Sequence, residues 1–165
     1  MYHSIVSYKL KKVFDALNQG NYQPMMDSLA EPFNYCFEGD LSISGSRNSR
    51  QTMIAWWQRI FRLLPGMQFD VKDVVVAGWP WNTRIHTHLE VSLLLKDGAV
   101  YRNVVMQVLH MRWGKLTSIL SLEDTARAAR LLAHFAKEGQ LEALAAPLTD
   151  LPWPLPGPFM SARLE

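Results

Sequence analysis

The chain has 165 residues, of which 48% are hydrophobic and 19% are charged, a composition typical of one globular domain and not of a disordered segment. Its formal net charge is only +2, so neither nucleic acid nor an anionic membrane surface is indicated as a partner. No stretch approaches the ~20 apolar residues of a membrane-spanning helix, and the N-terminus lacks the apolar run of a signal peptide. The single cysteine fits a reducing compartment, and we expect the protein to be cytoplasmic.

The first third of the chain has mostly helical spacing. Apolar residues within positions 6–17 recur every three or four residues and predict an amphipathic helix. Pro24 is expected to open a second, short helix, and alternation over residues 33–37 predicts a strand. Ser49 is expected to cap a third helix, which Pro65-Gly66 ends.

The period of the apolar residues then changes from 3.6 to 2. The predicted strands span residues 69–77, 84–95, 100–113 and 116–122, and tight turns join them. Consecutive hairpins of this kind predict an antiparallel meander, and two of the strands are longer than the usual five or six residues. Long strands in a small sheet twist and curl, so the sheet has a concave side that the helices can cover. The prediction is an α+β domain that encloses a mostly apolar pocket.

The C-terminal part of the chain divides into a helix and a proline-rich arm. A helix is expected to begin at Asp124 or Thr125 and to end near Gly139. We therefore assign residues 1–146 to one domain and residues 147–165 to an extended arm, which lies on its own domain or on a second subunit.

The order of these elements resembles the nuclear transport factor 2-like fold, and several short motifs are similar to its SnoaL-like, polyketide cyclase-like branch. The motifs are Phe37-Glu-Gly-Asp40, Gly45-Ser-Arg47, Trp57, Pro65-Gly66, Gly78-Trp-Pro-Trp81, Asp97-Gly98, Tyr101-Arg-Asn103, Arg112-Trp-Gly114 and Glu123-Asp-Thr125. The resemblance covers residues 8–129. It implies a cone-shaped, strongly bent antiparallel sheet (nuclear transport factor 2-like or cystatin-like) covered by N-terminal helices, with an extra C-terminal helix. The fold hosts enzymes, ligand binders and transport factors, so it implies no single reaction.

The catalytic residues of this fold carry over only in part. Ketosteroid isomerases use an Asp base and an oxyanion hole made of a Tyr and a protonated Asp. The oxyanion Asp corresponds to Leu109 in this chain and the base position falls near Cys36, so the resemblance does not extend to a conventional steroid isomerase. SnoaL-like cyclases use an Asp at the end of the last strand, and Asp124 matches that position approximately.

Asp124 is the candidate catalytic residue. As an acid/base it would need burial, which raises its pKa toward the working pH. The alternative, which the sequence favours, is an ordinary helix N-cap, because Asp is a preferred residue there.

Five further residues are candidates to contact a ligand. The strand face of Tyr101, Asn103 and Gln107 is expected to be concave, and its two amides would orient a carbonyl or hydroxyl group, or else bond neighbouring elements. Tyr35 and Trp57 could stack on a flat ligand, although aromatic residues at such spacing are more often plain core.

His86, His88 and Glu90 share one strand face, as metal ligands would. The opposite face of the strand is far more apolar and is the better core face, so we place the histidines on the convex side and predict no metal site. No cofactor motif is present in the sequence, and no cofactor is predicted.

The convex face is predicted to mix apolar and basic residues, which suits a homodimer interface. These residues are Arg102, Val104, Met106, His110 and Arg112. Three functions remain open for the pocket: a cofactor-free isomerase, cyclase or hydratase that acts on a small hydrophobic carbonyl compound, a non-catalytic binding protein for an apolar ligand, and a dimeric scaffold with a filled cavity.

Overall fold

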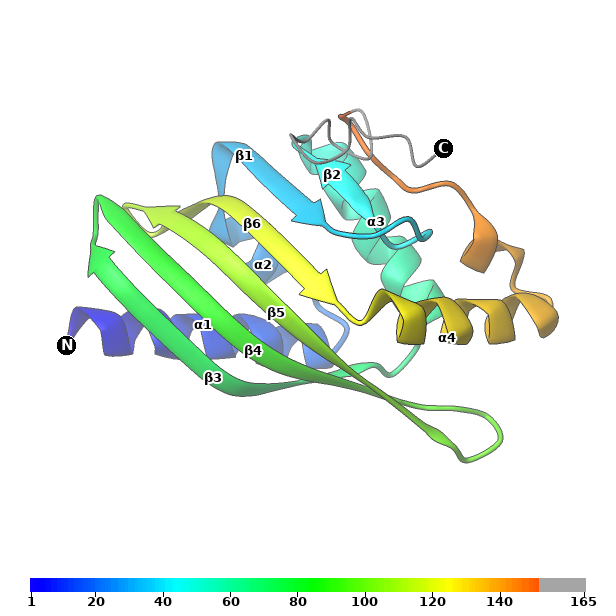
Figure 1. Ribbon diagram of the computed structural model, residues 1–165. Coiled ribbons are helices and arrows are strands. Elements are labelled where there is room, and N and C mark those ends of the chain that lie inside the picture. The colour runs from blue at the N-terminus through cyan, green and yellow to red at the C-terminus, as the bar shows by residue number, and fades with distance from the viewer. Residues whose placement is uncertain (152–165) are drawn as a thin grey trace, which may run out of the picture.

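The computed structural model describes residues 1–151, which form a curled six-stranded sheet with helices on its concave side (Figure 1). The strands are β1 (Leu29–Phe37), β2 (Gly45–Arg47), β3 (Gln68–Trp79), β4 (Asn82–Leu94), β5 (Val100–Arg112) and β6 (Lys115–Glu123). The helices are α1 (Tyr2–Asn18), α2 (Gln23–Ser28), α3 (Arg50–Leu63), α4 (Thr125–Lys137) and the short 3₁₀ helix η1 (Leu141–Leu144). The predicted α+β class is confirmed.

The strand order is β2-β1-β6-β5-β4-β3, and the strands from β3 to β6 form the predicted antiparallel meander. The edge of the sheet differs from the prediction, because β1 pairs with β6 in parallel and β2 adds a short antiparallel strand beside β1. β1 also begins earlier than expected. Its register with β6 shifts between Leu29 and Asn34, and Pro32 lies in that interruption, where a residue without an N–H is tolerated.

The helices cover the concave face of the sheet (Figure 1). α1 buries Val6, Leu10, Phe14 and Leu17, the apolar stripe that its spacing predicts. The Ser49 hydroxyl accepts the Thr52 N–H at 3.2 Å and so caps α3, as expected. No helix within residues 1–151 combines the length and apolar character that crossing a bilayer requires.

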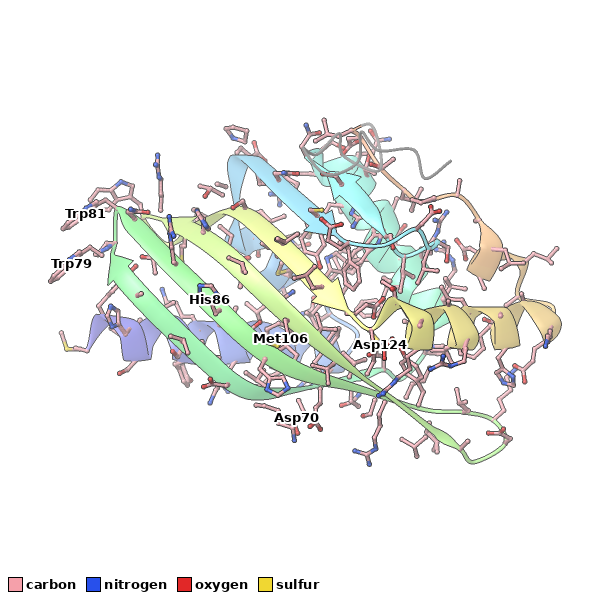
Figure 2. All side chains as sticks on the ribbon, viewed as in Figure 1. Asp70, Trp79, Trp81, His86, Met106 and Asp124 are labelled. Atoms are coloured by element: carbon pink, nitrogen blue, oxygen red, sulfur yellow. The ribbon has the colours of Figure 1, made fainter. Side chains whose placement is uncertain are left out.

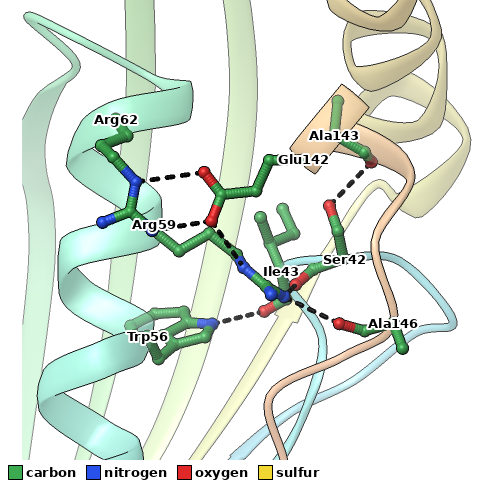
Figure 3. Close-up of polar contacts among 8 residues, drawn as sticks. All are labelled: Ser42, Ile43, Trp56, Arg59, Arg62, Glu142, Ala143 and Ala146. Atoms are coloured by element: carbon green, nitrogen blue, oxygen red, sulfur yellow. Dashed lines mark hydrogen bonds and ion pairs between the residues drawn. The ribbon is translucent and has the colours of Figure 1, made fainter. Parts of the chain in front are cut away.

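Polar contacts fix the loop before β2 and the segment around η1 against α3 (Figure 3). The Arg59 guanidinium donates to the Ser42 carbonyl at 3.0 Å and lies 3.4 Å from the Glu142 carboxylate. The indole Nε1 of Trp56 donates to the Ile43 carbonyl at 2.8 Å. These bonds hold the Trp56 ring in one orientation in the core.

The first residues of the predicted arm lie on their own domain. The Asp150 carboxylate accepts the backbone N–H groups of Asn48 and Ser49, each at 2.9 Å, at the start of α3. The Thr149 hydroxyl donates to the Ser46 carbonyl at 2.7 Å. Residues 152–165, which make up the rest of the predicted arm, lie outside the described part of the chain.

Candidate functional site

A cavity of about 70 Å³ lies between the concave face of the sheet and helices α1, α3 and α4. Its lining is mostly apolar, and four of the five predicted ligand-contacting residues take part in it: Tyr35, Trp57, Tyr101 and Gln107. Glu123 is the one carboxylate among the described residues that line the cavity. An apolar space with a few polar groups is the usual character of a small-molecule site.

Glu123 faces the cavity because of the alternation along β6. Ser121 is fully buried on the concave side, Leu122 turns outward and is 44% exposed, and Glu123 turns inward again. The strand therefore continues one residue beyond the predicted end at position 122, and this last residue brings an acid into the apolar interior.

The two oxygen atoms of Glu123 have different surroundings. Oε2 accepts from Nδ2 of Asn103 at 3.2 Å, whereas Oε1 is buried without a hydrogen-bond partner among residues 1–151. Burial, together with the nearby negative charge of Asp124, raises the pKa of Glu123 to about 7. A carboxyl group with this pKa is present in both protonation states near neutral pH, so it can both accept and return a proton.

Asn103 is buried and its amide is fully engaged by the protein. The two N–H groups of Nδ2 are shared among three acceptors: the Tyr101 hydroxyl at 2.8 Å, the Asp124 carbonyl at 3.1 Å and Oε2 of Glu123. Its Oδ1 accepts the Val104 N–H at 2.8 Å. Asn103 therefore positions Glu123 and Tyr101, and it is not among the residues that line the cavity.

The Tyr101 hydroxyl accepts from Asn103, which leaves its own proton available to another acceptor. Burial and the neighbouring Glu123 carboxylate raise the pKa of Tyr101 to about 12, so the hydroxyl stays protonated. Trp57 offers a second donor, because its Nε1 is buried and has no acceptor among residues 1–151. The site thus combines one acid with two donors.

The Gln107 amide is satisfied by its neighbours on the sheet. Its Nε2 donates to Ser121 Oγ at 2.9 Å, and its Oε1 accepts from the Thr87 hydroxyl at 3.2 Å. Tyr35 is 2% exposed, and burial raises the pKa of its hydroxyl. These residues contribute shape and polarity to the cavity rather than a free hydrogen-bonding group.

The Asp124 side chain lies at the surface at the start of α4 (Figure 2). Its Oδ1 accepts the Arg127 N–H at 3.0 Å, and its side chain is 45% exposed. This is the N-cap arrangement that the sequence favoured. The burial that a pocket acid/base requires is found at Glu123 instead.

The histidines of β4 lie on the opposite face of the sheet from the cavity. His86 and Met106 both project from the convex side (Figure 2), while Ile85, Thr87 and Leu89 are buried between them and the helices. Within residues 1–151, no three His, Cys, Asp or Glu side chains come together as metal ligands would.

The SnoaL-like domain profile matches residues 10–119, about two thirds of the chain. A search of curated proteins finds no match. Among solved structures, PrhC from Penicillium brasilianum NBRC 6234 is 15% identical with a TM-score of 0.72, covering 87% of this chain and 96% of its own. IdmH from Streptomyces antibioticus, a candidate polyketide cyclase, is 15% identical with a TM-score of 0.62. The match covers 78% of this chain and 98% of IdmH.

A third neighbour bears on the fold. A protein from Catenulispora acidiphila DSM 44928 with a ketosteroid isomerase-like fold, solved with trimethylamine, is 13% identical. Its TM-score is 0.57, and the match covers 68% of this chain and 82% of that protein. The predicted nuclear transport factor 2-like architecture is therefore confirmed.

Proposed function

Because the chain belongs to the SnoaL-like domain family, we propose that it is a cofactor-free isomerase, cyclase or hydratase for a small hydrophobic carbonyl compound, with Glu123 as the proton-transferring group. The observation that carries the proposal is Oε1 of Glu123, which is buried in an apolar cavity and has no hydrogen-bond partner in the described part of the chain. The similarity to a candidate polyketide cyclase and to a ketosteroid isomerase-like fold supports this class of reaction.

The proposed chemistry begins with proton removal next to the carbonyl group. Oε1 of Glu123 takes the proton from the α-carbon, the C–H electron pair forms a C=C bond, and the carbonyl oxygen becomes an enolate oxygen. The Tyr101 hydroxyl or the Trp57 indole N–H donates a hydrogen bond to this oxygen, where negative charge develops. Glu123 then returns the proton to another carbon. In a cyclase, the enolate carbon instead attacks a second carbonyl carbon, whose C=O π bond breaks as the ring closes, and the resulting alkoxide oxygen takes the proton from Glu123.

Glu123 lies outside the segment that matches the family. The matched segment ends at residue 119, before the inward-facing acid. Asp124 has the position expected for the family's acid, but it caps α4 at the surface. We therefore propose Glu123, the last residue of β6, as the acid, in place of Asp124, the first residue beyond the strand.

The proposal is tested without knowledge of the natural substrate. The protein is incubated with 2-hexanone in D₂O, and exchange of the α-protons is followed by NMR. We expect exchange above the buffer rate, and a loss of at least about 100-fold in Glu123→Gln, since a positioned general base contributes at least about that factor. The control is Glu90→Gln, which should exchange like the wild type. Glu90 is a surface acid whose Oε2 lies 3.3 Å from Nζ of Lys72.

The second candidate is a non-catalytic binding protein for an apolar ligand. The apolar lining of the cavity favours it, and the same experiment separates the two functions. A ketone that binds in the cavity without exchange above the buffer rate contradicts the enzyme and supports the binding protein.

We also propose a cytoplasmic location, supported by the free thiol of Cys36.

A further inference from the structure

The space under α1 does not end at the cavity. A groove of about 540 Å³ continues along the same concave face toward the N-terminal end of the helix. Leu10, Val13 and Met25 line both spaces and form the partition between them. The cavity and the groove are therefore neighbouring spaces that these three side chains separate.

Residues of β5 show how the two spaces follow one another. Val105 lies beside Glu123 in the sheet and lines the cavity, whereas Met111 lines the groove. At ~3.3 Å per residue along a strand, Met111 is about 20 Å from the level of Glu123. Gln107 and Leu109 are the inward side chains between these two ends, and both line the cavity.

The sizes of the two spaces argue for joint use. The cavity alone, at about 70 Å³, is well below the ~300 Å³ at which ordinary ligand sites begin, while the groove is within that range. Met25 in the partition belongs to the six-residue helix α2, and methionine is unbranched and adapts its shape readily. A shift of this side chain would join the spaces.

The far end of the groove has a different polarity from the cavity. Its inner surface is apolar and includes Ile5 and Ile85, but Lys9 and Lys12 stand at its edge with one acid, Asp27. An apolar chain would lie along the groove, and a polar or anionic group at its end would meet the lysines in solvent.

We propose that the ligand is an elongated carbonyl compound, an inference that rests on the proposed function. Its reacting carbonyl lies beside Glu123, its apolar chain passes Leu10 and Met25 into the groove, and its polar far end reaches the edge beside Lys9. The groove is then the subsite that selects chain length.

Calorimetric titration with three methyl ketones tests this inference. We use 2-hexanone, 5-oxohexanoate and 13-oxotetradecanoate. The short acid would hold its carboxylate in the apolar cavity and should bind weakly. The long acid has eight more methylenes and places its carboxylate in the groove; at ~4-fold per buried methylene, we expect it to bind at least 100-fold tighter than the short acid.

Two matched variants of α1 locate the chain. Ile5 lines the groove and is 46% exposed, so Ile5→Trp should fill the groove without unfolding the protein. Tyr8 is 62% exposed and does not line the groove, so Tyr8→Trp is the control. We expect Ile5→Trp to weaken the binding of 13-oxotetradecanoate at least tenfold and to change the affinity for 2-hexanone by less than twofold. Tyr8→Trp should change neither affinity.

The outcomes separate this inference from the proposed function. If the long acid binds no tighter than 2-hexanone, or Ile5→Trp leaves it unchanged, the inference is wrong, even where Glu123-dependent exchange persists. If the long acid binds and responds to Ile5→Trp while 2-hexanone protons are not exchanged, the groove stands and the enzyme proposal fails.

Discussion

The Nδ2 atom of Asn103 lies 3.2 Å from Oε2 of Glu123, and the same amide nitrogen bonds the Tyr101 hydroxyl at 2.8 Å. One buried amide therefore sets the positions of an acid and a hydroxyl donor that come from different strands. Oε1 of Glu123 remains free of this network, which is where a ligand can meet the acid.

Replacing Asn103 by Ala should raise the pKa of Glu123 above its wild-type value. The amide hydrogen bond favours the charged carboxylate, so its loss favours the protonated form. The free energy of unfolding should fall by about 1–3 kcal/mol, because buried partners of the amide lose their hydrogen bonds. Carboxyl ¹³C NMR titration measures the pKa and urea unfolding the stability. Asn48→Ala, at an exposed position, is the control, and an unchanged Glu123 titration would contradict the assigned contact.

Glu123→Gln should change how stability depends on pH. The folded-state pKa of about 7 is above the usual ~4.3, so the folded protein holds a proton that the unfolded chain releases between these values. Wild-type stability should therefore fall as the pH rises from about 4.5 to about 7, by up to about 3 kcal/mol. Glutamine has no charge to bury, so its variant should lack this decline. Urea unfolding at pH 5 and pH 8 measures the difference, and parallel pH dependences for both proteins would exclude a raised pKa.

Two substitutions of Asp124 distinguish the cap from the acid. Asn caps helices as well as Asp does, so Asp124→Asn should keep both stability and α-proton exchange. Asp124→Ala should lower the free energy of unfolding by about 1 kcal/mol, because the Arg127 N–H loses its acceptor. The Asp124 charge raises the pKa of Glu123, so the pH–rate inflection should move downward in Asp124→Asn. Loss of exchange in Asp124→Asn would return the acid/base role to Asp124.

Local patterns in the sequence predict most of this fold. The Ser49 cap and the apolar stripe of α1 are read correctly, because each depends on residues within one or two turns. The parallel pairing of β1 with β6 was missed, because no local signal joins strands so distant in the chain. The sequence prediction did not identify Glu123 because it ended the last strand at position 122. Had the strand included Glu123, the alternation of side chains would have predicted that Glu123 points inward.

The convex face of the sheet remains the predicted homodimer interface. Val104, Met106 and Leu122 are 39%, 46% and 44% exposed, and Met106 is directly opposite Leu122 in the β5–β6 pair. Burying such a patch against a second copy would remove apolar surface from water. We expect light scattering to give a dimer for the wild type and a monomer for Met106→Asp. Leu94→Asp, 70% exposed at the β4–β5 hairpin, should stay dimeric; a monomeric wild type would reject the interface.

Arg47 should be among the most sensitive positions for stability, although it does not line the cavity. It is fully buried, and its Nη1 donates to the Ser44 and Leu148 carbonyls at 3.0 and 2.8 Å. Its guanidinium carbon lies 4.5 Å from the centroid of the Trp56 ring and 5.4 Å from that of Tyr35. The cation therefore supports two aromatic residues of the cavity lining from behind.

Arg47→Met keeps an unbranched apolar side chain but removes the charge and the donors. The buried Ser44 carbonyl and the partly buried Leu148 carbonyl lose their partner, so the free energy of unfolding should fall by about 3 kcal/mol in urea titrations. Arg50→Met is the control: Arg50 is partly exposed and pairs with Glu31 at 3.5 Å on the surface, and its loss should cost less than about 1 kcal/mol. Burial raises the pKa of Tyr35, and the Arg47 charge partly offsets this effect. Tyr35 should therefore titrate at higher pH in Arg47→Met, which the absorbance of tyrosinate measures. Equal losses of stability in the two variants would show that the buried guanidinium contributes no more than a surface ion pair.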